Sequence, residues 1–498
     1  MSYTPYRLEH PALDHIRSPR YRAFLDGNVL AAGVKLLVQR RRLMPDYPFP
    51  NFKFNPNTGE DYPASHYETV FTWFLGRGSE ACVRHLEVLD GLEELHDIRD
   101  EARKILEGYV QSQNDAILGI LDRNRGRVPF RVNRRLEGVD AEGRRVSLPE
   151  ERCNASEFFC AKALLASGRA EEEEVGLKLL QRFLDSAFRN GYEDDTAVYD
   201  REIHAEGPFM LSLGAIDYLI RAKSLAGRHA EWESLTARLL SYVLDNFWEP
   251  SDAGCEGTAR GAAERLGQRN ARGRFFELVR FDTKEKQPFF VPGHACELVG
   301  LGLQAIDALE RSRVRGVGEA GGSAASETGR DDRRLRTGNG GRDGAGRPTL
   351  FERAKRELPR ILAMAFDGAY DRAHGGMYQS LDPVTGGVIS SDLPWWCMPE
   401  TMRAAARCAA VASGPEERRP FLEIFATVSN DYLGRFLNPR MGLFPFRTRD
   451  GETGGVKNFM PVVPEADPLY HTNLAVIDLL QVIERFPEEA SSVAQSGA

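Results

Sequence analysis

Residues 415–457 carry two patterns that together decide the fold. PEERRPFLEIFATVSNDYLGRF, at 415–436, spaces apolar residues three and four apart, at Phe421, Ile424, Phe425, Val428, Tyr432 and Phe436. This period predicts an amphipathic helix. GLFPFRTRDGETGGVK, at 442–457, places short apolar runs on either side of an Asp-Gly turn and predicts a β-hairpin. The chain is therefore expected to alternate helices with short hairpins.

The helical pattern recurs along most of the chain. In EEEEVGLKLLQRFLDSAF, at 171–188, an acidic first turn complements the helix dipole. Further helices are expected near 19–40 and at 79–95, 99–122, 154–167, 207–227, 230–248, 293–312, 349–366, 399–412 and 468–486. Further hairpins are expected at 128–147 and 375–390. About six helix pairs of this kind close into an all-α ring, the (α/α)6 toroid, with hairpins on one face.

The 498 residues are expected to form one large domain with additions at both ends. Residues 1–65 are expected to be a partly helical N-terminal extension, 66–486 the toroid, and 487–498 a flexible tail. The segment 312–348, rich in Gly, Arg, Ser and Asp, is expected to be a disordered insertion. Such an insertion is either tolerated on the surface or works as a regulatory lid.

Composition excludes several classes of partner. A net charge of -8 argues against nucleic acid or an anionic membrane. The polar start MSYTPYRLEHPALDH resembles no signal peptide, and no apolar run is long enough for a membrane span. Seven cysteines without CxxC spacing give neither a disulfide frame nor a zinc site. We expect a soluble cytoplasmic protein with reduced thiols.

Two histidines open helices directly after proline-bearing segments. His294 lies in VPGHACELVGLGLQAI, at 291–306, and His471 lies in DPLYHTNLAVIDLLQVI, at 467–483. A helix N-terminus favours the neutral imidazole, which can accept a proton. One such histidine alone is explained as a capping or packing residue, but two in equivalent positions favour an acid/base pair. Glu297, one turn after His294, could orient or charge-balance it.

Two adjacent tryptophans and an acid precede and open another helix. SDLPWWCMPE, at 391–400, holds Trp395, Trp396 and Glu400. An indole face stacks well on a sugar ring, although core packing is the alternative. Glu400 is either a ligand-binding carboxylate or a favourable acid in the first turn of the helix.

Other polar residues stand in apolar or glycine-rich surroundings. Glu157 interrupts an apolar helix and should face a polar cavity or a partner, and His204 precedes another helix. Arg77, between two glycines, could grip a hydroxyl, carboxylate or phosphate. The chain has no HExxH, P-loop, GxSxG or GxGxxG motif in its usual context. This argues against a metalloprotease, an NTPase, a serine hydrolase or a dinucleotide-binding protein.

Together these stretches resemble the N-acylglucosamine 2-epimerase family, which includes cellobiose 2-epimerases and aldose–ketose isomerases with a six-hairpin, glycosidase-like toroid. PGHACE at 292–297 is similar to the family's PGHxxE, DLPWWCMPE at 392–400 to its WWxxxE, and LYHTN at 469–473 to its aromatic–histidine segment. ASEFFCAKALLA at 155–166 is similar to its acidic inner helix. The resemblance runs roughly from 65 to 486, apart from the insertion.

The resemblance implies a carbohydrate 2-epimerase or isomerase that needs no cofactor or metal. His294 and His471 would remove and return the proton on the carbon beside the sugar carbonyl, with a cis-enediolate as the intermediate. Acid/base groups of this kind need pKa values near neutral pH, which suits histidine. Glu297 would support His294, and Arg77 would polarise the carbonyl oxygen. The substrate contacts implied are Trp395 or Trp396 stacked on the sugar, with Glu157, Trp73 and His204 around it, and Glu400 would be a supporting residue. The family resemblance is also the only basis for expecting a homodimer.

The substrate contacts depart from the family pattern. Asn473 and Leu474 stand where the family often has Pro-Arg, and Ala466 stands where cellobiose-type members have tryptophan. PFMLSLGAIDYL, at 208–219, lacks the polar residues that disaccharide epimerases place there. An Arg-x-x-Trp pattern that begins at Arg77 would put tryptophan where Glu80 stands. Placing the tryptophan at Trp73 instead leaves no arginine three residues earlier, so the sugar is not identified.

Two other functions stay open. A glycoside hydrolase or lyase on the same toroid would use two of Glu157, Glu297 and Glu400, separated by roughly 6.5–9.5 Å in an inverting hydrolase. A non-catalytic carbohydrate-binding protein would keep the tryptophans and lack the proton transfer.

Overall fold

The computed structural model describes residues 4–50, 54, 60–193, 202–251, 273–321, 349–438, 444–445, 448–457 and 469–486. No helix in these ranges is long and apolar enough to cross a membrane. The six cysteines in the described ranges are buried and form no disulfide.

Within the described residues, six helical segments pack side by side into a closed inner ring. The ring begins with α4 (Thr72–Val88) and α6 (Ala155–Ala166), and continues through the short pair α8 (Gly207–Leu213) and α9 (Ile216–Arg221). It continues through α11 (Pro292–Gly321) and α13 (Cys397–Val411) to the π-helix η9 (Tyr470–Leu474) and α15 (Ala475–Ile483). Because η9 packs back against α4, the ring closes.

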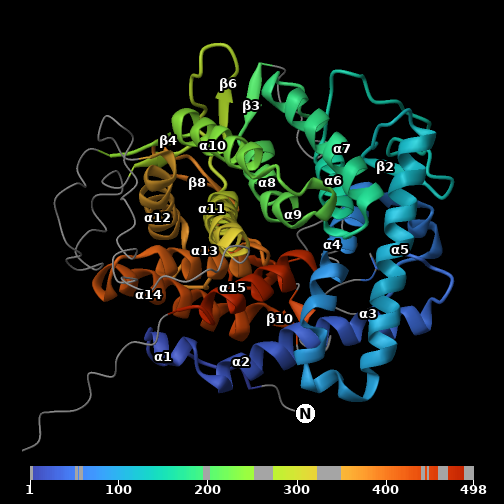
Figure 1. Cartoon of the computed structure of the whole chain (residues 1–498). Coiled ribbons are helices and arrows are strands. Elements are labelled where there is room, and N and C mark those ends of the chain that lie inside the picture. The colour runs from blue at the N-terminus through green and yellow to red at the C-terminus, as the bar shows by residue number, and fades with distance from the viewer. Residues whose placement is uncertain are drawn as a thin grey trace, which may run out of the picture.

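An outer layer of helices covers this ring (Figure 1). The outer helices are α5 (Arg99–Arg123) on α4, α7 (Ala170–Phe188) on α6, α10 (His229–Asn246) on α8 and α9, α12 (Leu350–Ala369) on α11, and α14 (Pro415–Asp431) on α13. Each outer helix buries its apolar stripe against its inner partner, as amphipathic periodicity requires. The predicted all-α (α/α)6 toroid is confirmed.

The N-terminal helices supply the outer partner of the last inner segment. After α1 (Leu13–Ile16), they run through α2 (Pro19–Leu25), the π-helix η1 (Asp26–Ala31) and α3 (Ala32–Leu43), close to the helix expected near 19–40. Asn473 Nδ2 in η9 donates to the Val29 carbonyl at 3.3 Å, and the hydroxyls of Tyr21 and Ser429 lie 2.6 Å apart. The expected division of the chain at residue 65 stays a prediction.

Two helix boundaries differ from the sequence-based expectation. The helix expected at 79–95 is α4, which already begins at Thr72, because Gly76 is a packing residue and not a break. A Cβ at Gly76 would collide with the backbone of Phe159 in α6. The helix expected at 293–312 is α11, which continues to Gly321 and so takes in the first ten residues expected to be disordered. The remainder of that insertion, 322–348, and the tail, 487–498, lie outside the described residues.

The helix expected at 207–227 is broken in two at Gly214 and Ala215, between α8 and α9. The other expected helices begin and end within a few residues of the predicted positions. Helix existence therefore follows the periodicity, whereas a glycine can mark either a break, as at Gly214, or a close contact between helices, as at Gly76.

Short antiparallel pairs lead into the inner helices. The hairpin expected at 375–390 is confirmed as β7 (Ser380–Leu381) with β8 (Val388–Ser390), and that at 442–457 as β12 (Thr448–Asp450) with β13 (Val456–Lys457). The segment 128–147 turns back on itself as expected, but its strand β2 (Arg131–Asn133) forms its ladder with β1 (Thr69–Phe71). Within the segment, Val139 bridges Arg145, and the Asp140 N–H donates to the Arg144 carbonyl at 2.9 Å.

Most of the remaining pairs join segments that are far apart in the sequence. β3 (Ile203–Ala205) pairs with β6 (Leu278–Arg280), and β9 (Asp392–Leu393) joins β12. β4 (Trp248–Glu249) pairs with β5 (Arg274–Phe275), and β10 (Leu437–Asn438) with β11 (Phe444–Pro445). Because β1, β3 and β9 lead directly into α4, α8 and α13, they lie at the N-terminal ends of inner helices.

Candidate active site

His294 lies in the first turn of α11 and is held by a buried carboxylate. Pro292 opens the helix, a position where its missing N–H costs nothing. The His294 Nδ1 is 2.8 Å from Oε1 of Glu277, whose side chain is 3% exposed, while the His294 side chain is 35% exposed. Since a carboxylate only accepts, we assign the proton to Nδ1, which makes Nε2 the acceptor nitrogen.

His471 repeats this arrangement in η9, on the far side of α13 from α11. Its Nδ1 lies 2.9 Å from Oε1 of Glu400, which is in the first turn of α13, and both side chains are buried. His471 belongs to the π-helix η9, and the preceding Leu469 has φ of 67°. Left-handed backbone at leucine and short π-helices are both unusual and recur at functional sites.

Trp396 joins the two histidines. Its ring centroid is 5.4 Å from that of His294 and 5.4 Å from that of His471. Gly293 allows this approach, because a Cβ there would lie 2.5 Å from the Trp396 indole. Trp395 is buried with its ring 6.3 Å from that of His471. The two histidines and the two tryptophans, far apart in the sequence, therefore form one cluster with Glu400.

Glu297, expected to support His294, is not the acid that binds its Nδ1. The carboxylate on Nδ1 of His294 belongs to Glu277, 17 residues upstream. Glu297 instead lies with Glu400 and His471, and one ligand-type atom from each falls within 4.8 Å of the others. Helical spacing from His294 identified Glu297 as a candidate partner. It could not identify Glu277, because Glu277 reaches His294 from the strand region that pairs with β3. The available signal was an acid inside the apolar run RFFELVRF at 274–281.

The spacing of Glu297, Glu400 and His471 would also allow a shared cation. However, Nδ1 of His471 is hydrogen-bonded to Glu400, and the Arg403 guanidinium forms an ion pair with the same carboxylate. Burial raises the pKa of Glu400, while the charges of Arg403 and Lys162 lower it. We interpret the group as a charge-balanced hydrogen-bond network, and the expectation of no cofactor stays a prediction.

Arg77 lies beside this cluster, in α4. Its guanidinium carbon is 4.4 Å from the ring centroid of Trp73, 4.2 Å from that of Phe159 and 4.8 Å from that of Tyr470. Such contacts fix the cation over aromatic faces. Because Tyr470 directly precedes His471, and the Arg77 charge lowers the pKa of Glu400, Arg77 and Trp73 border the histidine cluster.

A buried polar network, not foreseen from the sequence, supports η9. Lys162 Nζ in α6 lies 2.9 Å from Oε1 of Glu80 and donates to the Tyr470 hydroxyl at 3.0 Å. The Tyr218 hydroxyl donates to the same Glu80 oxygen at 2.8 Å. Burial raises the pKa of both tyrosines, so both phenols stay protonated. The network ties α4, α6, α9 and η9 together next to His471.

Two predicted site residues lie elsewhere. The Glu157 carboxylate accepts from Arg127 Nε at 2.9 Å and Arg182 Nη2 at 2.8 Å, so it joins α6 to α7. His204 is fully buried, with its ring 5.1 Å from Phe209 and 5.6 Å from Tyr242 of the outer helix α10. Burial lowers the pKa of His204 to about 4. The structure does not bring either residue to the histidine cluster.

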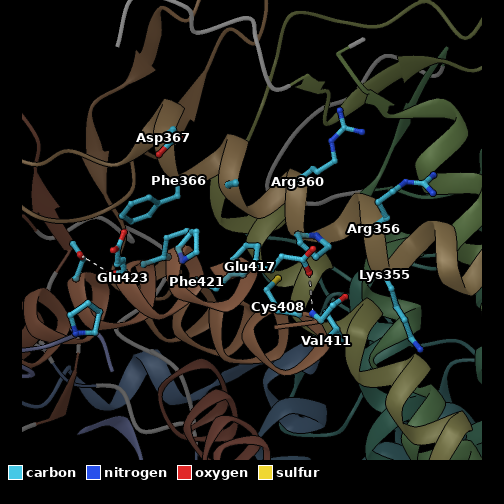
Figure 2. Close-up of a pocket in the computed structure, with 18 of the residues that line it drawn as sticks. Lys355, Arg356, Arg360, Phe366, Asp367, Cys408, Val411, Glu417, Phe421 and Glu423 are labelled. Atoms are coloured by element: carbon cyan, nitrogen blue, oxygen red, sulfur yellow. Dashed lines mark hydrogen bonds between the residues drawn. The ribbon is translucent and has the colours of Figure 1, made fainter. Parts of the chain in front are cut away.

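The outer surface has a separate groove of about 1030 Å³, over α12 and α14 (Figure 2). Its lining mixes cations such as Lys355, Arg356 and Arg360 with acids such as Glu417 and Glu423. None of the predicted site residues lines this groove.

Comparison with known proteins shows the fold. No protein-family model matches the chain, and no curated protein matches it in sequence. It is similar to a solved D-mannose isomerase, with TM-score 0.56 and 14% identity over 95% of this chain and 100% of that one. It is also similar to a sugar epimerase from a ruminal bacterium, with TM-score 0.55 and 12% identity over 91% of this chain and 100% of that one. The cellobiose 2-epimerase from Bacillus thermoamylovorans B4167 matches with TM-score 0.53 and 12% identity over 91% of this chain and 100% of that one.

Proposed function

We propose that the protein is a carbohydrate epimerase or isomerase of the N-acylglucosamine 2-epimerase type. The observation that carries the proposal is the pair of histidines, each bonded through Nδ1 to a buried glutamate and both against Trp396. The similarity in fold to a D-mannose isomerase and to sugar epimerases supports a sugar as substrate.

In the proposed reaction, Nε2 of one histidine removes the proton from the carbon beside the carbonyl of the open-chain sugar. The electron pair of the broken C–H bond forms the enediolate, and a histidine returns a proton to complete the change. Glu277 and Glu400 stabilise the imidazolium that forms on His294 or His471, and they hold each ring in one tautomer. Both histidines can therefore alternate between base and acid.

Neighbouring side chains would hold the sugar. Trp396, half-buried between the two histidines, offers its face to the apolar side of a sugar ring. Arg77 would polarise the carbonyl oxygen. Glu297, near His471 and Glu400, would accept a hydrogen bond from a sugar hydroxyl. We assign no substrate contact to Glu157 or His204.

The geometry favours proton transfer over inverting glycoside hydrolysis. Glu157 is committed to two arginines. The nearest ligand atoms of Glu297 and Glu400 lie within 4.8 Å, closer than the roughly 6.5–9.5 Å of an inverting carboxylate pair. Glu400 also already binds His471 and Arg403.

Solvent exchange tests the proposal. The full-length protein is incubated in deuterated water with D-mannose, cellobiose or an N-acylated glucosamine. Proton NMR should show deuterium on the carbon beside the carbonyl of at least one sugar, and His294→Gln or His471→Gln should abolish it. His374→Gln is the matched control, because His374 Nδ1 also binds a carboxylate, that of Asp371 at 2.8 Å, in a hairpin. Exchange that survives in either cluster variant contradicts the assignment, and release of a reducing sugar without exchange indicates a hydrolase.

A further inference from the structure

Glu206 is a buried acid that the proposed reaction does not use. It directly precedes α8 and is 0% exposed. Neither of its carboxyl oxygens has a hydrogen-bond partner among the described residues. An ionised carboxylate in this state would lose its hydration without compensation, which is costly in a protein interior.

The backbone places Glu206 beside the glutamate that binds His294. The Glu206 N–H donates to the Glu277 carbonyl at 2.9 Å, and the register of β3 with β6 pairs Ala205 with Leu278. Of the two Glu277 carboxyl oxygens, Oε1 binds His294, and Oε2 has no partner among the described residues. Two buried acids thus lie together, and between them only one oxygen is bonded to a donor.

The surrounding charges determine which acid holds a proton. Burial, followed by the negative charges of Glu277 and of Glu297 in α11, raises the pKa of Glu206 well above its usual range. Glu277 differs because its Oε1 has the His294 N–H as a donor, whereas neither Glu206 oxygen has a donor among the described residues. When two carboxyl groups share a dry site, one keeps its proton and can donate a hydrogen bond.

We propose that Glu206 is a carboxylic acid that donates its proton in a hydrogen bond to Oε2 of Glu277 and so positions the carboxylate that orients His294. This inference rests on the proposed function, in which His294 exchanges the substrate proton. Glu206 is a positioning residue, because it acts through Glu277 and is shielded from the substrate. The pair Glu206–Glu277 then carries a single negative charge, which balances the single positive charge of the His294 imidazolium.

Two variants separate this neutral donor from an ionised Glu206. In Glu206→Gln the amide N–H replaces the acid O–H as donor, whereas Glu206→Leu has similar size and no donor. If Glu206 is a neutral donor, ¹⁵N NMR should give His294 the same titration midpoint in Glu206→Gln as in the native protein. In Glu206→Leu the midpoint should rise, because Glu277 loses a donor and attracts the imidazolium more strongly. If Glu206 is ionised, both variants remove a negative charge and lower the His294 midpoint together, which overturns the proposal. Equal midpoints in the native protein and the two variants overturn it as well.

Infrared difference spectroscopy and kinetics complete the test. The native-minus-Glu206→Gln spectrum should contain the C=O band of a protonated carboxyl group at neutral pH, and its absence overturns the proposal. Glu206→Leu should lower kcat about tenfold or more, with Glu206→Gln restoring it and shifting no limb of the pH profile. Glu357→Gln, which removes a buried acid bound to Trp248 and Arg360, controls for general destabilisation. If the native protein is inactive on every sugar, the proposed function is refuted but the proposal for Glu206 is not. The NMR and infrared results would still show whether Glu206 is protonated.

Discussion

Gly293→Ala should disable the cluster by displacing one indole ring. The added Cβ would meet Cys397 Sγ and would lie 2.5 Å and 2.8 Å from two atoms of the Trp396 ring. Ordinary carbon–carbon contacts are about 3.5–4.0 Å, so the ring or the helix start must move by about 1 Å. Because Trp396 contacts both His294 and His471, this movement shifts the substrate relative to both.

The magnitudes follow from this displacement. A misplacement of about 1 Å at a reacting centre lowers a rate by about a hundredfold, and forcing one carbon into a packed site costs about 1–3 kcal/mol of folding free energy. The control is Gly108→Ala in the exposed part of α5, where a Cβ has no neighbour within 4 Å. That change should stabilise the protein by about 0.5–1 kcal/mol, because alanine favours a helix interior.

The assay compares deuterium exchange and urea unfolding of the two variants with those of the native protein. We expect Gly293→Ala to lose both rate and stability, and Gly108→Ala to lose neither. Tryptophan fluorescence should change in Gly293→Ala alone, because only there does the indole move. If Gly293→Ala exchanges deuterium at the native rate, Trp396 does not organise the two histidines and the reasoning is refuted.

Two further predictions concern protonation. Glu400→Gln removes the negative charge beside His471, so kcat should fall about tenfold to a hundredfold. The limb of the exchange profile that reports His471 should move to lower pH, because the imidazolium loses its counter-charge. An unchanged profile would exclude the Glu400–His471 pair from the reaction. Burial lowers the pKa of both His85 and His204 to about 4, below the 6.5 of the unfolded chain, so the unfolded state binds their protons first. The free energy of unfolding should therefore fall by about 1.4 kcal/mol per pH unit for each histidine as pH drops from 6.5 toward 4, and urea titrations of His85→Gln and His204→Gln should each show a shallower fall.

The helical framework was predictable because its signal is local. The apolar period in 415–436 gave α14 and the π-helix Tyr432–Phe436 that follows it. Turn residues likewise gave the hairpins around β7–β8 and β12–β13, since an Asp/Gly turn constrains only its own neighbours. Long-range pairing was not predictable, as in the ladder that β2 forms with β1.

The candidate site divides in the same way. His294, His471, Trp396 and Glu400 each stand near a helix start, which the sequence marks with proline and glycine, so each could be singled out beforehand. Their partners could not, because Glu277, Glu80 and Lys162 reach the cluster from other parts of the ring. Glu157 was predicted to be a substrate contact because an acid in an apolar helix needs a partner. Its partners are Arg127 and Arg182, whose positions the local pattern does not show.

The sequence by itself determined the helices, their pairing into a toroid and the histidines that open two inner helices, because periodicity, caps and turns act over a few residues. Only the tertiary structure decided which carboxylate holds His294, that Glu297 lies with Glu400 and His471, and that Glu206 is buried beside Glu277. These are contacts between segments that the closed ring brings together. Their energies depend on burial and on distances that no local pattern encodes.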